Sequence, residues 1–133
     1  MEELRGRLGT RLHLLGWRGD IAAVLAAMDV VVNTSENEGM PVALIEAGGA
    51  AKPVVATDVG STREVVASDE TGFVLDYDAD AFADRVLKLL ADPGLRAAMG
   101  ESGRARVVER FSDARLAADV AKMYERLVAD VNR

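Results

Sequence analysis

Two glutamates flank the start of a predicted helix, and they are the side chains best placed to do chemistry. The run SENEGMPVALIEA spans residues 35–47, with Glu38 before the helix and Glu46 on it. Glu46 follows Val42 by four residues, so the two share a helical face. Carboxylates repel phosphate but accept hydrogen bonds from neutral hydroxyl groups. The pair is therefore suited to the hydroxyls of a sugar-containing ligand.

Between the two glutamates, the chain can offer backbone amides to an anion. Gly39 allows a tight turn or a close backbone approach. Pro41 suits the first helical position, where the amide that it lacks would be unpaired. The free N–H groups of Val42 and Ala43 then point out of the helix, toward a site that favours negative charge. A nucleotide-sugar has hydroxyl groups on both sides of its diphosphate. One glutamate would bind the ribose and the other the sugar, with the helix amides between them on the diphosphate.

The spacing of the two glutamates does not establish a site by itself. Glu in a first helical turn is often only favourable dipole electrostatics. Glu101 and Glu109 repeat the same eight-residue step in a stretch that is predicted to be a solvated helix. The functional interpretation therefore depends on the elements around the motif.

Those elements alternate between strands and helices. Strands are predicted at 11–15, 29–33, 53–57 and 72–76, and helices at 20–27, 41–51 and 61–67. The Val-rich second and third strands are typical of a parallel sheet buried on both faces, so the fold class is α/β. Ligands of such sheets bind at the carboxyl ends of the strands. Three loops leave those ends, at residues 16–19, 34–40 and 58–61.

The last third of the chain is predicted to be helical. An apolar stripe follows Asp80, Asp92-Pro93 resembles a helix cap with Pro at the first position, and Ser112 can cap the final helix. The stripe consists of Phe82, Val86, Leu89 and Leu90. The face predicted for the final helix consists of Leu116, Val120, Met123, Leu127 and Val131. Both are expected to pack in the core.

Composition limits the function further. The 133 residues suit one domain, 1–133, and the net charge of −6 without a basic cluster argues against nucleic acid as a partner. The absence of cysteine excludes disulfides, thiolate metal sites and a Cys nucleophile. No run is apolar enough to span a membrane and no signal peptide is recognisable, which favours a cytoplasmic location or a peripheral one at the inner membrane face. The single histidine, His13, is expected to be structural within the first strand.

Six ordered blocks over about 120 positions resemble the retaining, GT-B-fold glycosyltransferases that carry a Glu-x7-Glu motif, the glycosyl transferases group 1 family. They include LLGWRGDIAAVLAAMDVVVNTSENEGMPVALIEAGGAAKPVVATDVGSTREVV, TGFVLDYDADAFADRVLKLLADPGLR and GRARVVERFS. The resemblance implies a Rossmann-like parallel sheet with flanking helices, the C-terminal half of a GT-B fold. It also implies hexosyl transfer, with a nucleotide-sugar as substrate and with neither metal nor other cofactor.

By this resemblance, each site residue has a role. Glu38 is the catalytic residue and contacts the donor sugar hydroxyls, together with backbone near Gly39 and Met40. The Val42 and Ala43 amides meet the diphosphate, and Glu46 binds the ribose. The loop formed by Gly16, Trp17 and Arg18 lies against the base. Pro41 also lies at the donor site, but it replaces a frequent Gly and removes one potential amide contact.

The sequence departs from the family pattern in two other ways, at Ala51 and in the segments that the family has before the part matched here. Ala51 replaces a frequent Gly, with no argued consequence. The family's first two strands of this domain, the Arg and Lys that follow them, and the acceptor domain have no counterpart here. Arg18 and Arg63 lie in suitable loops, but nothing marks either as a substitute. We therefore expect no transfer by this chain alone.

The missing strands also affect the sheet. They would lie between 11–15 and 29–33, which leaves the Val-rich second strand with an open edge. Such an edge favours self-association or completion by a missing N-terminal half.

Two other functions stay open. One is a non-catalytic module of the same fold that binds a nucleotide-sugar or a protein partner. The other is a domain like a sugar-nucleotide epimerase. The run Ser-x-x-Glu-Gly-Met-Pro favours the transferase, but the sequence does not define the donor sugar, the acceptor or the linkage.

Overall fold

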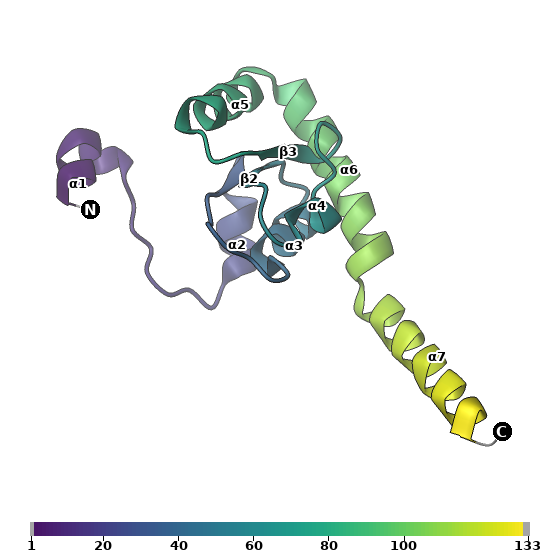
Figure 1. The fold of residues 1–133 in the computed structure, drawn as a ribbon. Coiled ribbons are helices and arrows are strands. Elements are labelled where there is room, and N and C mark those ends of the chain that lie inside the picture. The colour runs from purple at the N-terminus through teal and green to yellow at the C-terminus, as the bar shows by residue number, and fades with distance from the viewer. Residues whose placement is uncertain (1, 132–133) are drawn as a thin grey trace.

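A parallel sheet of three strands forms the centre of the computed structural model, which describes residues 2–131 (Figure 1). The strands are β1 (Val31–Asn33), β2 (Val54–Thr57) and β3 (Gly72–Leu75), in the order β1-β2-β3. The register pairs Val31 with Val54 and Val55 with Phe73. All four residues of β2 are buried, as expected for a Val-rich central strand. The predicted α/β class is confirmed.

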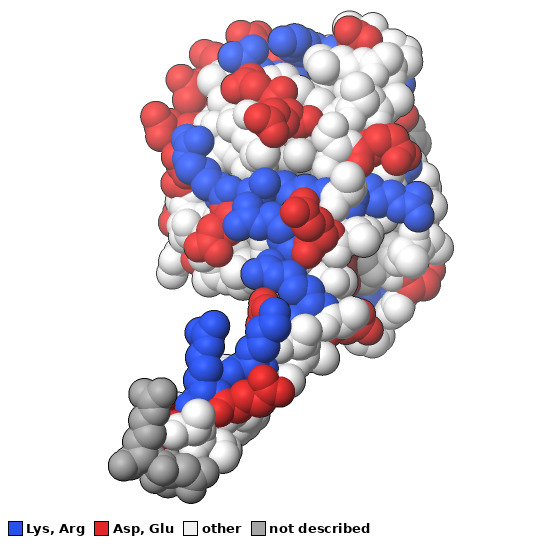
Figure 2. All heavy atoms as spheres, turned by 90° about the vertical axis from the view of Figure 1, so that its right-hand side faces the viewer, with Lys and Arg blue, Asp and Glu red and all other residues white. Residues whose placement is uncertain are grey.

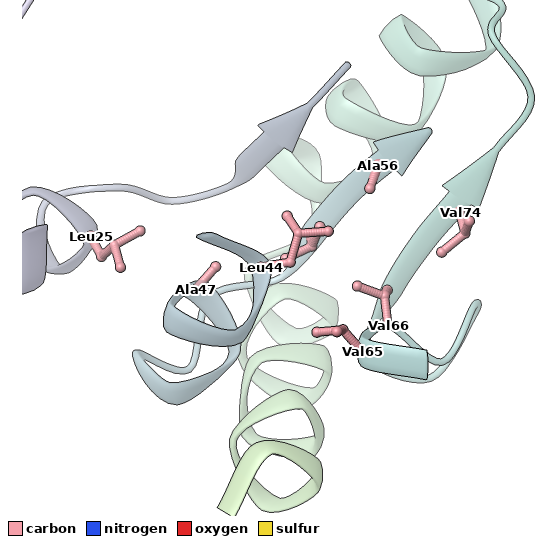
Figure 3. Close-up of a cluster of buried hydrophobic side chains, with 8 residues drawn as sticks. Leu25, Leu44, Ala47, Ala56, Val65, Val66 and Val74 are labelled. Carbon is pink, nitrogen blue, oxygen red and sulfur yellow. The ribbon is translucent and has the colours of Figure 1, made fainter. Parts of the chain in front are cut away.

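Helices cover both faces of the sheet because alternate residues of β2 point in opposite directions. On one face, Val54 and Ala56 pack with Leu44 of α3 (Val42–Gly49), in a cluster that α2 (Ile21–Ala26) and α4 (Thr62–Val65) complete (Figure 3). On the other face, Val55 packs with residues of α5 (Ala79–Ala91) and α6 (Pro93–Phe111). The buried residues of this second cluster are Val55, Phe73, Phe82, Leu89 and Met99.

Local capping signals fix the boundaries of the C-terminal helices. The Asp78 side chain accepts from two amides at the start of α5, and Asp92 accepts from Leu95 N at 2.9 Å with Pro93 at the first position of α6. The Ser112 hydroxyl accepts from Arg115 N at 3.4 Å, where α7 (Asp113–Val131) begins. The predicted caps at Asp92-Pro93 and Ser112 are confirmed.

The end of α3 gives the substitution at Ala51 a consequence. Lys52 N donates to Ala47 O at 3.0 Å and Ala51 N to Gly48 O at 2.8 Å, the two bonds of a Schellman motif. Ala51 occupies its left-handed position with φ of 55°, where glycine is ordinarily found. The left-handed backbone costs a non-glycine residue about 1–2 kcal/mol.

The predicted strand at 11–15 is wrong. The N-terminal segment forms α1 (Glu2–Leu8) and a 3-10 turn, η1 (Gly9–Arg11), and then runs irregularly beside the body (Figure 1). Leu14 and Leu15 are 48% and 52% exposed, and His13 lies in this irregular segment rather than in a strand. A strand requires a neighbour to bond with, and none of the described strands adjoins these residues.

The other edge of β1 is therefore open. Among the described strands, β1 bonds only to β2, and residues 11–15 do not close the gap. Val32, in the middle of β1, is 47% exposed. The predicted open edge is confirmed, and self-association stays a prediction.

The expected core packing of the final helix is also wrong. Helix α7 projects from the body in Figure 1, and every residue from Asp113 to Asp130 is exposed. The side chain of Val131 lies outside the described part of the structure. In α5, Leu90 is 50% exposed while Phe82 and Leu89 are buried, so its stripe is narrower than predicted. Between residues 2 and 131, no helix has the length and apolar character needed to cross a bilayer.

Candidate functional site

The candidate site lies where β1 and β2 end, and two loops meet there. The first loop, residues 34–41, follows β1, and the second, residues 58–61, follows β2. The Thr57 hydroxyl donates to Ser35 O at 2.5 Å, and Ser61 N donates to Gly39 O at 3.2 Å. These two bonds attach the loop that carries Glu38 to the end of the buried strand β2 and to the loop that follows it. We call residues 34–41 the pinned loop.

Gly60 makes the closest contact between the two loops. Its φ is +53°, and a Cβ atom there would lie 1.8 Å from the Glu38 carbonyl oxygen. Only glycine combines this backbone conformation with that approach. Gly60 was not among the residues predicted for the site, although a glycine in the loop after a buried strand is the signal that could have identified it.

Neighbouring side chains hold the Glu38 carboxylate in place. Asn33 Nδ2 donates to Glu38 Oε1 at 3.1 Å, and Asn33 Oδ1 accepts from Ser35 N at 2.9 Å. Hydrogen bonds from the side chains of Ser35 and then Asn33 hold the pKa of Glu38 below its usual value. Glu38 is therefore an ionised hydrogen-bond acceptor at neutral pH. Asn33 and Ser35, which position this carboxylate, were not among the residues predicted for the site.

Helix α3 begins directly after the pinned loop. Pro41 is buried and caps the helix, so the prediction that it is the first helical residue is wrong by one position. Leu44 N donates to Pro41 O at 3.0 Å and is the first bonded amide of the helix. The preceding amides, of Val42 and Ala43, therefore have no intrahelical acceptor. Both residues are exposed.

Glu46 lies farther along α3 and faces a different space. It is exposed and lines a cavity of about 560 Å³ between α2 and α3. The cavity is otherwise lined by Ile21, Ala22, Leu25, Ala26, Gly49, Ala50 and Lys52. Glu38 does not line this cavity. The two carboxylates therefore lie in different places, Glu38 in the loop before α3 and Glu46 on the helix, beside the cavity.

The structure does not bring the Gly16–Trp17 loop together with the glutamates. Gly16 has a φ of +63°, with nothing within 4 Å of the position of a Cβ. Trp17 is 93% exposed and Met40, in the pinned loop, is 45% exposed. The Trp17 side chain is thus not packed against the rest of the site, and its contact with the base stays a prediction.

The two arginines near the site are both paired with carboxylates. Arg18 forms two hydrogen bonds with Asp20, one from Nε to Oδ1 at 2.7 Å, and they lower the pKa of Asp20. Arg63 Nη2 lies 2.6 Å from Asp58 Oδ2, and the hydrogen bond with Asp58 raises the pKa of Arg63. Neither guanidinium is placed as a free phosphate ligand. Among residues 2–131, no three acidic or histidine side chains form a group that could hold a metal ion.

Residues 1–92 match the family described as glycosyl transferases group 1. The chain belongs to this family. It is 32% identical to N-acetyl-alpha-D-glucosaminyl L-malate synthase of Bacillus anthracis over 124 residues, 92% of this chain and 32% of that protein. It is 36% identical to alpha-maltose-1-phosphate synthase of Mycobacterium tuberculosis over 118 residues, 84% of this chain and 30% of that protein. The chain thus spans about a third of the length of these relatives.

Solved glycosyltransferase structures share the fold. Sucrose-phosphate synthase from Thermosynechococcus elongatus matches with a TM-score of 0.89 and 31% identity, over 97% of this chain and 34% of that one. Anabaena Alr3699/HepE in complex with UDP matches with a TM-score of 0.88 and 27% identity, over 94% of this chain and 35% of that one. The Rossmann-like, GT-B-type architecture predicted from the sequence is confirmed.

Proposed function

We propose that this chain forms the donor-binding part of a retaining glycosyltransferase that uses a nucleotide-sugar. The observation that carries the proposal is the arrangement at the start of α3. An ionised Glu38, fixed by Asn33 and Ser35, stands in the loop that leads into α3, four and five residues before the Val42 and Ala43 amides, which have no intrahelical acceptor. An acceptor of hydroxyl hydrogen bonds next to donors for an anion suits the sugar and diphosphate of such a donor.

The amides of Val42 and Ala43 would bind the diphosphate. The positive end of a helix dipole favours an exposed anion by about 0.3–1 kcal/mol per charge. In the transfer step, the bond between the sugar and the diphosphate breaks, the sugar bonds to an acceptor hydroxyl oxygen that loses its proton, and negative charge develops on the leaving diphosphate oxygen. Donors already aimed at that position stabilise this charge without reorganising.

The glutamates would bind hydroxyl groups on the two sides of the diphosphate. Glu38 would accept from the donor sugar, with the backbone of Gly39 and Met40 beside it, and Glu46 would accept from the ribose. The cavity at Glu46 supports the second role, because it offers apolar walls next to a carboxylate. Alr3699/HepE, whose complexes contain UDP and UDP-glucose, supports a uridine-nucleotide donor as the first to test.

Transfer also needs an acceptor site and cations for the diphosphate. Arg18 and Arg63 are engaged by Asp20 and Asp58, and the relatives are about three times longer than this chain. We therefore assign the acceptor site and the remaining cations to a part of the enzyme outside these 133 residues. The second candidate, a non-catalytic donor-binding module, is favoured by the same engaged arginines.

Calorimetry with a panel of nucleotide-sugars tests the proposal, with UDP-glucose first. Glu46→Ala should weaken donor binding by about 1–3 kcal/mol, or roughly 5- to 150-fold, because a carboxylate hydrogen bond is lost. Glu109→Ala, an exposed glutamate on α6, is the matched control and should leave the affinity unchanged. Equal effects of the two substitutions, or no binding by any donor, would contradict the assignment.

Acceptor-dependent turnover separates the two candidate functions. The donor-binding chain joined to the remainder of a relative should transfer radiolabelled sugar if it belongs to an enzyme. Donor binding without transfer in that setting would favour the non-catalytic module.

A further inference from the structure

Thr57, the last residue of β2, connects the sheet to the pinned loop at a point that the backbone ladder does not reach. Strand β1 pairs with β2 only as far as Asn33, which lies opposite Ala56. Strand β2 pairs with β3 one residue farther, where Thr57 lies opposite Leu75. Beyond the end of β1, the Thr57 hydroxyl donates to Ser35 O at 2.5 Å. A side-chain hydrogen bond thus continues the connection after the backbone ladder between β1 and β2 has ended.

Ser35 is held at three points, and two of them lead to Glu38. Its carbonyl accepts from Thr57, its amide donates to Asn33 Oδ1 at 2.9 Å, and its side chain forms a hydrogen bond with Glu38. Because Asn33 Oδ1 faces the Ser35 amide, Asn33 Nδ2 faces Glu38 and donates to its Oε1 at 3.1 Å. The position of Ser35 therefore determines both of these hydrogen bonds to the Glu38 carboxylate.

The hydrogen bond from Thr57 is sheltered from water, unlike the charged contacts of the surface. Thr57 is 2% exposed, and β2 has a bonded strand on each side. On the face that Figure 2 shows, Lys and Arg are interspersed with Asp and Glu. Arg115 and Asp119 of α7 lie 3.2 Å apart, but both side chains are about half exposed, so solvent and salt screen their attraction. A buried hydrogen bond is stronger than one in water, and this one ties the pinned loop to the central strand.

The groups assigned to the nucleotide lie outside this series of hydrogen bonds. The amides of Val42 and Ala43 belong to the first turn of α3, and Glu46 lies farther along the helix, beside its cavity. The hydrogen bonds that connect Thr57 to Glu38 do not include these groups. A change at Thr57 is therefore transmitted to the group assigned to the sugar and not to the groups assigned to the nucleotide.

We propose that Thr57 is a positioning residue for the donor sugar, which sets the Glu38 carboxylate through Ser35 and Asn33. This role rests on the proposed function, because the contact with the sugar is the one assigned to Glu38. The Thr57 hydroxyl is engaged by Ser35 O and acts on the sugar only through Glu38. A carboxylate that is already held in place loses less conformational freedom when it binds a hydroxyl group, and this raises the affinity for the sugar.

Thr57→Val tests this role, because valine keeps the branched shape of the side chain and removes the hydroxyl. Calorimetry of the 133-residue chain with UDP and with UDP-glucose separates the two parts of the donor. Thr57→Val should weaken binding of UDP-glucose by about 2- to 10-fold, the range for one neutral hydrogen bond, and should leave binding of UDP unchanged. Thr57→Ser keeps the hydroxyl, so it should bind both ligands as the wild type does. An equal loss for UDP and UDP-glucose, or a loss in Thr57→Ser that matches Thr57→Val, would overturn the proposal.

Thr71→Val is the matched control. Thr71 is also buried, and its hydroxyl donates to a backbone carbonyl, Ala67 O, at 3.3 Å. It precedes β3, at the end of the sheet opposite the pinned loop. Thr71→Val should lower stability toward denaturant, as Thr57→Val does, but should keep the ratio of the two affinities. A change in this ratio equal to that in Thr57→Val would show that general destabilisation alters sugar binding, and would overturn the proposal.

NMR titration of the Glu38 carboxyl separates this proposal from the proposed function. Thr57→Val should raise the pKa of Glu38 toward its ordinary value, because the hydrogen bonds from Ser35 and Asn33 lower it in the wild type. Thr57→Ser should leave this pKa unchanged. An unchanged pKa of Glu38 in Thr57→Val would overturn the positioning role even where donors bind. A raised pKa in a chain whose wild type binds neither ligand would instead overturn the donor function, and with it the role toward the sugar.

Discussion

The pinned loop, residues 34–41, and the loop at residues 12–20 are both assigned to the donor, but the rest of the chain holds them differently. The pinned loop is bonded to Thr57 at the end of β2 and to Ser61 in the next loop, and it is packed against Gly60. In the loop at 12–20, the ion pair joins Arg18 to Asp20 of the same loop, and Trp17 is exposed. Glu38 is thus placed before any ligand arrives, whereas Trp17 is not.

This difference follows from the sheet. The pinned loop leaves β1 beside β2, a strand with bonded neighbours on both sides, and the loop after β2 lies next to it. Residues 12–15 have no strand beside them among the described elements. A donor would therefore meet preformed groups for its sugar and diphosphate. Its base would contact the loop at 12–20, which neighbouring residues do not hold in place in the same way.

Gly60→Ala should have the largest effect on the difference between the pinned loop and the loop at 12–20. The added Cβ meets the Glu38 carbonyl oxygen at 1.8 Å, so the pinned loop must move. We expect a loss of free energy of unfolding on the order of 2–4 kcal/mol and weaker donor binding. Denaturant unfolding and calorimetry measure the two effects.

Gly16→Ala is the matched control for Gly60→Ala. Gly16 also has a positive φ, of +63°, but no atom within 4 Å of the new Cβ. Its cost should be limited to the backbone conformation, about 1–2 kcal/mol. An equal or larger cost at Gly16 would show that the loop at 12–20 is held as firmly as the pinned loop.

Ser35→Ala should have an intermediate effect, confined to the charge of Glu38. Loss of the largest contributing hydrogen bond should raise the pKa of Glu38 toward its ordinary value. The folded-state pKa is lowered, so its contribution to stability is present above the ordinary pKa and is lost as pH falls through the lowered one. In the variant, the contribution should be smaller and its loss should be complete at a higher pH, because the folded-state pKa lies nearer the ordinary one.

NMR titration of the Glu38 side-chain carboxyl measures the shift. Ser102→Ala, at an exposed position on α6, is the control and should not change the pKa of Glu38. A pKa of Glu38 that is the same in Ser35→Ala and in the wild type would refute the idea that the pinned loop tunes this carboxylate.

Trp17→Ala should have the smallest effect on stability. The side chain is 93% exposed, so its removal should change the free energy of unfolding by less than about 0.5 kcal/mol. Thermal and denaturant unfolding check this. A cost comparable to that of Gly60→Ala would mean that Trp17 is packed in solution and that the two loops are equally ordered.

The sequence alone predicts those parts of the protein that local rules determine. The caps at Asp92-Pro93 and Ser112 depend on hydrogen bonds within a few residues, and the Val-rich run of β2 reports burial on both faces. The position of Glu38 before a helix whose first amides are free also follows from local sequence. These signals are enough for the α/β class, whereas the roles predicted for the donor-site residues came from the family resemblance.

Only the tertiary structure decides features that depend on a partner distant in the sequence. The apolar pattern at 11–15 fits a strand, but hydrogen bonds to a neighbour make a strand, and here no described neighbour exists. The stripe on α7 fits a core helix, yet nothing in the described chain covers it. The requirement for glycine at Gly60 arises from the carbonyl of Glu38, twenty-two residues earlier. Local sequence encodes the periodicity and caps of each element, whereas its neighbours determine whether its apolar face is buried.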